Sequence, residues 1–243
     1  MPSVSIGSSV NWAVLAAYLV ATFLVCGIPF GKLIARAKGV DIQKVGSGNI
    51  GTTNVAREIG KGAAALTLAL DAGKGALATG LASVLFQRDG FVLVPGSGVS
   101  VAPTGAGAWL VGLVMVAAVW GHVFSPFLRF HGGKGIAVGV GSLLGFLWPV
   151  GLVELGIFAL IVAFTKRVSA GSVTVAAILP VVAGIAYGWN WPLVATLSVA
   201  GWTVVWAHRT NIVKLSQGRE GAFSFHKKGA ATDPLDGGEG SGR

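Results

Sequence analysis

The stretch that decides the fold is Gly135–Thr165, which reads GIAVGVGSLLGFLWPVGLVELGIFALIVAFT and carries one charged residue, Glu154. At about 1.5 Å per residue, a helix of this length is far too long for one membrane crossing and short for two. Basic residues precede and follow the stretch, namely Arg129, Lys134, Lys166 and Arg167. Basic loops stay in the cytoplasm, so both ends are expected there. We therefore predict two spans that meet near Trp148-Pro149, the first of them short.

Five further apolar runs have the length and composition of membrane spans: Trp12–Gly31, Gly62–Phe86, Ala108–Phe124, Val168–Tyr187 and Trp191–Ala207. Together the runs predict an all-α integral membrane protein with seven transmembrane helices. The N-terminus is expected outside and the C-terminus in the cytoplasm, because Arg88 is then the one loop cation left outside. We predict a single seven-span domain over residues 1–228, followed by a disordered polar tail at 229–243.

The composition supports a membrane protein and excludes a disordered chain. The mean hydropathy of the 243 residues is +0.74, and 11% of them are charged. The net charge of +9 lies in loops between apolar runs. We attribute it to membrane topology and to attraction for anionic head groups or phosphates, and expect no nucleic-acid partner. Cys26 is the single cysteine, so an intramolecular disulfide is impossible.

A polar, glycine-rich stretch, VGSGNIGTTNVAR at Val45–Arg57, lies on the predicted cytoplasmic side. Its glycines allow positive φ and close approach of the backbone to a ligand. Successive N–H groups, hydroxyls and a closing arginine suit a phosphate. The pattern is neither a Walker A loop nor a GxGxxG turn after a strand, and the alternative is a plain linker. The candidate binding residues are Gly46, Ser47, Gly48, Asn49, Thr52, Asn54 and Arg57.

Three more polar stretches fall on the same side: GHVFSPFLRFHGGKG at 121–135, TKRVSAGS at 165–172 and AHRTNIVKLSQGRE at 207–220. Lys134, among glycines at the start of a helix, has the features of a phosphate clamp, although basic residues at a membrane surface are the alternative. His208 is a candidate acid, base or hydrogen-bond donor. The other candidate binding residues are His122, Ser125, Gly133, Ser169, Ser172 and Asn211. We expect one site at the membrane–cytoplasm boundary and no metal in it.

Two charged residues, Asp71 and Lys74, lie three positions apart inside the second apolar run. Charges within a membrane are costly and are usually paired or functional. The spacing allows them to pair on one helix face. They form either a structural pair or a wall of the site, and Lys74 is counted among the candidate binding residues. Glu154 has no partner that the sequence identifies.

The stretches VGSGNIGTTN, GHVFSPFLRFHGGKG, KRVSAGS and HRTNIVKLSQGRE together resemble the bacterial acyl-phosphate:glycerol-3-phosphate acyltransferases (PlsY) in order and spacing. The resemblance runs from the first apolar run to about Glu220. Three residues depart from those common in the family: Thr52 replaces an alanine, His131 a lysine and Lys214 an arginine. The loss of charge at His131 is expected to weaken phosphate binding there.

The resemblance implies a bacterial plasma-membrane enzyme whose active site faces the cytoplasm and which needs no cofactor. It transfers a fatty acyl group from acyl phosphate to the 1-hydroxyl of glycerol 3-phosphate, giving lysophosphatidic acid and inorganic phosphate. The implied partners are these two substrates and membrane lipid. The expected catalytic residues are His208, Asn49 and Ser47.

Acyl phosphate is already activated, so the enzyme needs mainly to align the hydroxyl and stabilise the oxyanion. The backbone N–H groups of Ser47–Asn49 are candidates for the oxyanion hole. The base that accepts the hydroxyl proton is either His208 or the phosphate of the donor itself. No histidine is followed five residues later by aspartate, the pair typical of acyltransferases that use thioesters. The rival functions are a transporter or channel for a phosphorylated anion and a lipid-phosphate phosphatase.

Overall fold

The computed structural model describes residues 9–88, 91–94 and 96–221. The predicted tail at 229–243 and the last residues of the predicted domain, 222–228, lie outside this part. Within it the named elements are all helical, as predicted: α1 Trp12–Gly27, α2 Phe30–Ala37, α3 Thr52–Glu58, α4 Lys61–Leu85, α5 Ala108–Val123, η2 Pro126–Leu128, α6 Ile136–Phe146, α7 Trp148–Thr165, α8 Val168–Tyr187, α9 Trp191–Ala207 and α10 Arg209–Ser216.

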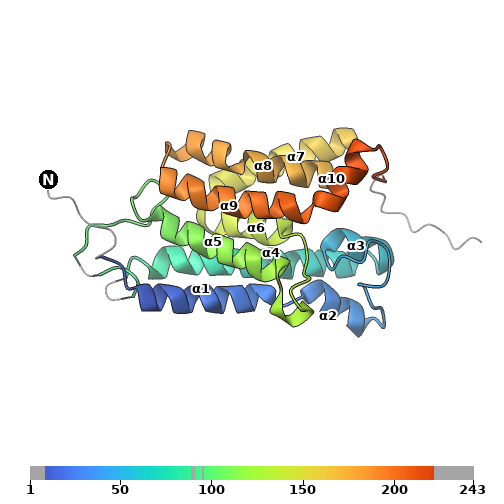
Figure 1. The fold of residues 1–243 in the computed structure, drawn as a ribbon, viewed down its shortest axis with the longest axis horizontal. Coiled ribbons are helices and arrows are strands. Elements are labelled where there is room, and N and C mark those ends of the chain that lie inside the picture. Colours follow the sequence, from blue (N-terminus) through green and yellow to red (C-terminus); the bar gives the residue numbers. More distant parts are fainter. Residues whose placement is uncertain (1–8, 89–90, 95, 222–243) are drawn as a thin grey trace, which may run out of the picture.

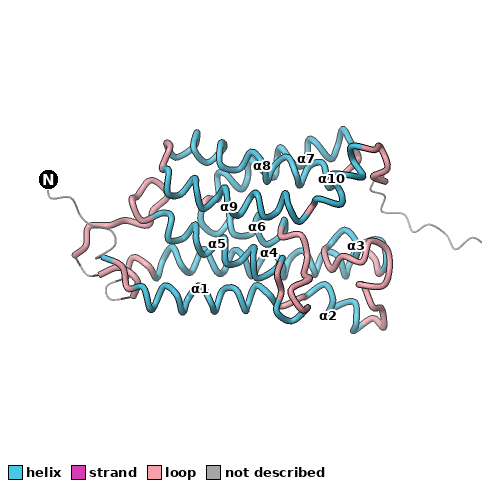
Figure 2. Tube along the Cα trace, in the orientation of Figure 1, coloured by secondary structure: helices cyan, strands magenta, loops and turns pink. Residues whose placement is uncertain are grey.

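The long helices α1 and α4–α9 run along the long axis of the molecule (Figure 1). The short helices α2, α3 and α10 and the loop that joins α2 to α3 lie at one end, which we call the polar end (Figure 2). Five described segments are long and apolar enough to cross a membrane: Trp12–Ala37, Lys61–Leu85, Ala108–Leu128, Trp148–Thr165 and Val168–Tyr187. The helices α6 and α9 are apolar but shorter.

The first apolar run, the predicted span Trp12–Gly31, lies within one candidate span at Trp12–Ala37 that consists of two helices. α1 ends at Gly27, and α2 begins at Phe30 after Pro29. Proline has no backbone N–H and disfavours helical geometry in the residue before it, so it favours a helix end at this position. The break directs α2 and the glycine-rich stretch that follows it to the polar end.

Close packing of α6 on α4 positions one wall of the site. A Cβ atom added at Gly141 of α6 would lie 1.9 Å from the carbonyl oxygen of Ala72 of α4, and one at Gly145 would lie 2.4 Å from that of Ala76. Small residues at such positions let two helix backbones approach closely. Because Lys134 immediately precedes Gly135, the N-cap of α6, and the two helices run in the same direction, this packing places Lys134 beside the first turns of α4.

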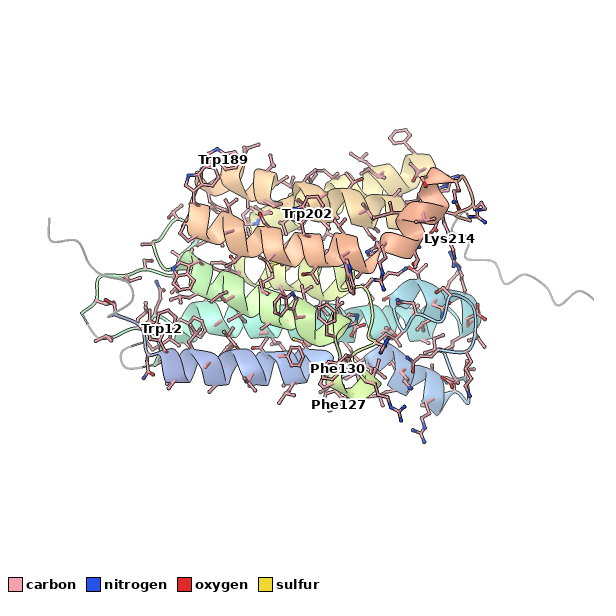
Figure 3. All side chains as sticks on the ribbon, viewed as in Figure 1. Trp12, Phe127, Phe130, Trp189, Trp202 and Lys214 are labelled. Atoms are coloured by element: carbon pink, nitrogen blue, oxygen red, sulfur yellow. The ribbon has the colours of Figure 1, made fainter. Side chains whose placement is uncertain are left out.

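Two tryptophans and a lysine mark opposite ends of the bundle. Trp12 and Trp189 lie at the end away from α10, whereas Lys214 lies at the polar end (Figure 3). Trp12 contacts Trp109, with ring centroids 6.3 Å apart, and Trp189 stacks on Trp191 at 5.3 Å. Tryptophan favours membrane interfaces, and basic loops favour the cytoplasmic side. The distribution matches the pattern expected of a bundle that crosses a bilayer.

Candidate active site

All four polar stretches converge on one cavity of about 300 Å³ at the polar end. Its apolar half is formed by α4, α6, α7 and α8, with Leu68, Ala137, Phe158 and Val175 among the lining residues. The predicted site residues that line it are Ser47, Asn49, Thr52, Asn54, Arg57, His122, Lys134, Ser169, Ser172, His208 and Asn211. The cavity therefore joins a polar mouth to an apolar interior.

Asn54 holds the glycine-rich stretch in shape. Its side chain is buried and donates to the carbonyl oxygens of Ile42, Val45 and Asn49 at 3.0–3.3 Å, while its Oδ1 accepts from the Ser47 N–H at 2.9 Å. Gly46 and Gly48 have φ values of +57° and +69°, which L side chains rarely adopt. These two glycines shape the turn, although neither lines the cavity.

This geometry corrects the predicted oxyanion hole. The Ser47 N–H already donates to Asn54, and the Gly48 N–H donates to the Val45 carbonyl at 3.0 Å. Two of the three expected backbone donors are therefore occupied by the loop itself. The Asn49 side chain lines the cavity, and its Oδ1 accepts from the Gly51 N–H at 2.8 Å, which leaves its Nδ2 group as the available donor.

Thr52 and Arg57 reach the cavity from α3. The Thr52 hydroxyl is buried and has no hydrogen-bond partner in the described part of the chain. Arg57 makes no hydrogen bond or ion pair with any described residue. A buried hydroxyl without a partner costs free energy, and a guanidinium at a cavity wall is suited to phosphate. Both groups are available to a ligand.

Glu220 links three of the polar stretches. Lys134 Nζ donates to Asn211 Oδ1, Asn211 Nδ2 donates to Glu220 Oε1 at 2.9 Å, and Ser169 Oγ donates to the same oxygen at 2.8 Å. Glu220 lines the cavity but is absent from the predicted site residues. The sequence could have indicated Glu220, because it is the single carboxylate in the basic stretch 207–220.

The electrostatics around Lys134 favour an anion. Burial lowers the pKa of Lys134 from its ordinary value; Glu220 opposes this shift, and Lys214 and Arg57 reinforce it. Several cations thus lie within electrostatic range of one another, with one carboxylate among them. A phosphate placed between Lys134 and Arg57 would relieve that repulsion, as at other sites where cations converge.

His208 caps α9 with a defined tautomer. It is buried, and its Nδ1 lies 2.8 Å from the carbonyl oxygen of Val204. A carbonyl only accepts, so Nδ1 carries the proton and Nε2 is left as an acceptor. The pKa of His208 is lowered to about 4, mainly by burial and also by the cation of Lys134, while the hydrogen bond to Val204 and the charge of Glu220 act in the opposite direction. The imidazole is therefore neutral near pH 7.

A buried cluster lies behind the cavity wall. Lys74 Nζ donates to Asp71 Oδ1 at 2.7 Å and to the Ile28 carbonyl at 2.9 Å, and lies 3.2 Å from His122 Nδ1. Asp71 and His122 line the cavity, whereas Lys74 does not. Ser125, whose hydroxyl donates to the Gly27 carbonyl at 2.6 Å, and Gly133 also lie outside the lining. Asp71 and Lys74 thus form a pair, and Asp71 is also part of the wall.

The chain resembles proteins of known function over most of its length. The family model described as glycerol-3-phosphate acyltransferase matches residues 16–218. A glycerol-3-phosphate acyltransferase of Rubrobacter xylanophilus is 40% identical over 209 residues, which is 85% of this chain and 94% of that protein.

Two crystal structures of PlsY, described as an integral membrane glycerol 3-phosphate acyltransferase, have a similar fold. The glycerol 3-phosphate form has a TM-score of 0.75 at 30% identity and covers 86% of this chain and 96% of that one. The lysophosphatidic acid form has a TM-score of 0.73 at 29% identity, covering 87% and 96%. This chain is accordingly a multi-pass membrane protein, and it belongs to the glycerol-3-phosphate acyltransferase family.

Proposed function

We propose that this protein transfers a fatty acyl group from acyl phosphate to the 1-hydroxyl of glycerol 3-phosphate, which yields lysophosphatidic acid and inorganic phosphate. The observation that carries the proposal is the cavity, which joins a cationic, glycine-rich mouth to an apolar interior between α4, α6, α7 and α8. An acyl phosphate matches this arrangement, because it has an anionic phosphate at one end and an apolar chain at the other. Family membership favours this reaction over transport of a phosphorylated anion or lipid-phosphate hydrolysis.

The phosphate groups bind at the polar mouth. Lys134 and Arg57 provide charge-assisted hydrogen bonds, and the unpartnered Thr52 hydroxyl provides another. Each hydrogen bond to a charged group contributes about 1.5–3 kcal/mol, so a few of them give a useful affinity. The chain Lys134–Asn211–Glu220–Ser169 keeps the lysine oriented while it contacts the ligand. Both substrates carry a phosphate, and the related structures are described as glycerol 3-phosphate and lysophosphatidic acid forms.

The hydroxyl attacks the acyl carbonyl, a new C–O bond forms and the bond to the phosphate oxygen breaks. His208 accepts the hydrogen bond of the hydroxyl through Nε2 and orients it. With a pKa of about 4, His208 holds a proton weakly, so the proton passes to the departing phosphate, which is the stronger base. The Nδ2 group of Asn49 and the hydroxyl of Ser47 stabilise the oxyanion.

The topology we propose has seven spans within one domain over residues 1–228, with the N-terminus outside and the polar end in the cytoplasm. Trp12 and Trp189 at one end and Lys214 at the other support this orientation. Single cysteines at Ser97 and Ser216, introduced with Cys26→Ala, should react with an impermeant thiol reagent from opposite sides of the membrane. Labelling of both from the same side would exclude the seven-span topology.

The donor is tested with purified protein, glycerol 3-phosphate and either palmitoyl phosphate or palmitoyl-CoA. Phosphate release and thiol release are followed in parallel, and the lipid product is identified by mass spectrometry. We expect lysophosphatidic acid from palmitoyl phosphate without added metal, and little product from the thioester. Comparable turnover with palmitoyl-CoA would refute the donor assignment, and absence of acylated product from either donor would refute the proposed function.

A further inference from the structure

Glu154 is a buried carboxyl group whose two oxygens have no hydrogen-bond partner in the described part of the chain. It lies on α7, and its side chain is 2% exposed. Nearly every buried polar group in a folded protein has a partner, so an orphaned carboxyl requires an explanation. Glu154 lines the cavity described above, and nothing in the proposed chemistry uses it.

Glu154 lies at the deep end of that cavity. The residues of α7 that line the cavity are Glu154, Leu155 and Phe158, and Glu154 is the one furthest from the polar end. The rise of about 1.5 Å per residue places it roughly 16 Å along the helix from Thr165. The deepest lining residues of the neighbouring helices, Val140 of α6 and Val175 of α8, are apolar. The phosphate groups at the mouth are thus well separated from this carboxyl.

A second, smaller cavity of about 30 Å³ adjoins this deep end. Glu154 lines both cavities, and the other residues around the second one are apolar, among them Met115, Leu143 and Leu179. Glu154 therefore lies at the boundary between the larger cavity and a further apolar space. The Glu154 carboxyl at this boundary contacts any molecule that fills the deep end of the larger cavity.

A hydrocarbon chain and water affect Glu154 in opposite ways. Water in the deep end can hydrogen-bond to the carboxyl, because the larger cavity has room for it. An acyl chain long enough to reach Glu154 displaces that water and offers no hydrogen bond in return, which leaves the carboxyl buried and unpaired. A shorter chain ends before Glu154 and leaves the hydration in place.

We infer that Glu154 determines acyl-chain specificity by disfavouring donors whose chain is long enough to reach it. The inference rests on the proposed function, because it concerns the acyl donor of the same reaction. It identifies a residue that contacts the chain terminus rather than the reacting atoms. Replacement of the carboxyl by an apolar side chain should open the deep end, and the small cavity behind it, to longer chains.

The test compares decanoyl, myristoyl and stearoyl phosphate as donors for the wild type and for Glu154→Leu. We expect the ratio of kcat/KM for stearoyl over decanoyl phosphate to rise about tenfold in Glu154→Leu, equivalent to about 1.4 kcal/mol. Glu154→Gln is the matched control, because its amide is nearly isosteric and still polar; its ratio should stay within about threefold of the wild type. Melting temperatures confirm that each variant is folded.

Two results would overturn the inference. The first is a stearoyl-to-decanoyl ratio in Glu154→Leu that equals the wild-type ratio. The second is a shift in Glu154→Gln as large as that in Glu154→Leu, which would show that polarity is not the cause. In both cases the wild type still acylates glycerol 3-phosphate, so the proposed function stands. A wild type inactive with all three donors would instead refute the proposed function.

Discussion

Two lysines near the cavity, Lys74 and Lys134, have different surroundings in the structure. Lys74 is buried in the middle of α4, and Lys134 is partly buried just before α6. Lys74 donates to Asp71 and to a backbone carbonyl, lies against His122, and is absent from the cavity lining. Lys134 donates to the neutral side chain of Asn211 and lines the cavity. Lys74 is neutralised by Asp71, whereas no carboxylate of the described residues forms an ion pair with Lys134.

The comparison shows what separates a structural charge from a binding charge. Removing one member of a buried ion pair leaves its partner uncompensated, so Lys74 should matter chiefly for stability. A cation with a neutral partner keeps its charge for a ligand, so Lys134 should matter chiefly for activity. Measuring stability and activity of the same variants therefore tests the distinction.

The largest effect is expected from Lys74→Met. The substitution leaves the Asp71 carboxylate buried without its cation, which should cost about 3–5 kcal/mol of stability. At roughly 2–4 °C per kcal/mol for a chain of this size, the apparent melting temperature in detergent should fall by roughly 10 °C. The double variant Asp71→Leu with Lys74→Met removes both charges and should recover part of the loss. A Lys74→Met variant as stable as the wild type would show that the ion pair with Asp71 does not stabilise the fold.

Lys134→Ala should give the largest loss of activity without loss of the fold. Because the lysine contacts a phosphate directly, kcat/KM for glycerol 3-phosphate should fall about a hundredfold, or about 2.7 kcal/mol. Its melting temperature should stay close to that of the wild type. Lys166→Ala is the matched control, because Lys166 is an exposed cation outside the cavity lining, and it should be nearly neutral. Near-normal kinetics in Lys134→Ala would contradict the role of this lysine.

The smallest effect concerns His208, which lies within electrostatic range of Lys134. Its pKa is about 4 in the folded protein against an ordinary value of 6.5. The unfolded chain therefore binds the proton more readily, and the stability present above pH 6.5 is lost as the pH falls toward 4. Between about pH 7 and about pH 5 the loss should be about 2 kcal/mol.

Melting curves at these two pH values measure the effect. His208→Gln has no titrating imidazole, so its melting temperature should fall less than that of the wild type over the same interval, by roughly 5 °C. Other titrating groups contribute equally to both proteins and cancel in the comparison. Parallel pH dependence in the two proteins would show that the histidine is not held neutral by burial.

The sequence predicted the helices well because hydrophobic runs are local signals. Each of the seven predicted spans contains a helix, although α6 has only 11 residues, and the stretch Gly135–Thr165 divides at Leu147, next to the predicted boundary. The break at Pro29 was missed, because the apolar run continues through it although the helix does not. Whether all seven helices cross the membrane stays a prediction.

The site was predicted less completely because its contacts join residues far apart in the chain. The sequence identified the four stretches, and the structure brings them to one cavity. It did not reveal that Asn54 accepts the hydrogen bond of the Ser47 N–H, that Glu220 connects Asn211 and Ser169, or that Lys74 is absent from the cavity lining. Each of these depends on which partner a polar side chain finds in three dimensions.

A crystal structure of the protein with glycerol 3-phosphate bound tests the central claim most directly, because the claim concerns where the phosphate lies. We predict that the phosphate lies within hydrogen-bonding distance of Lys134 Nζ and the Arg57 guanidinium, with the 1-hydroxyl directed at His208 Nε2. A phosphate bound at Lys166 and Arg167 instead, or a hydroxyl pointing away from His208, would contradict the account.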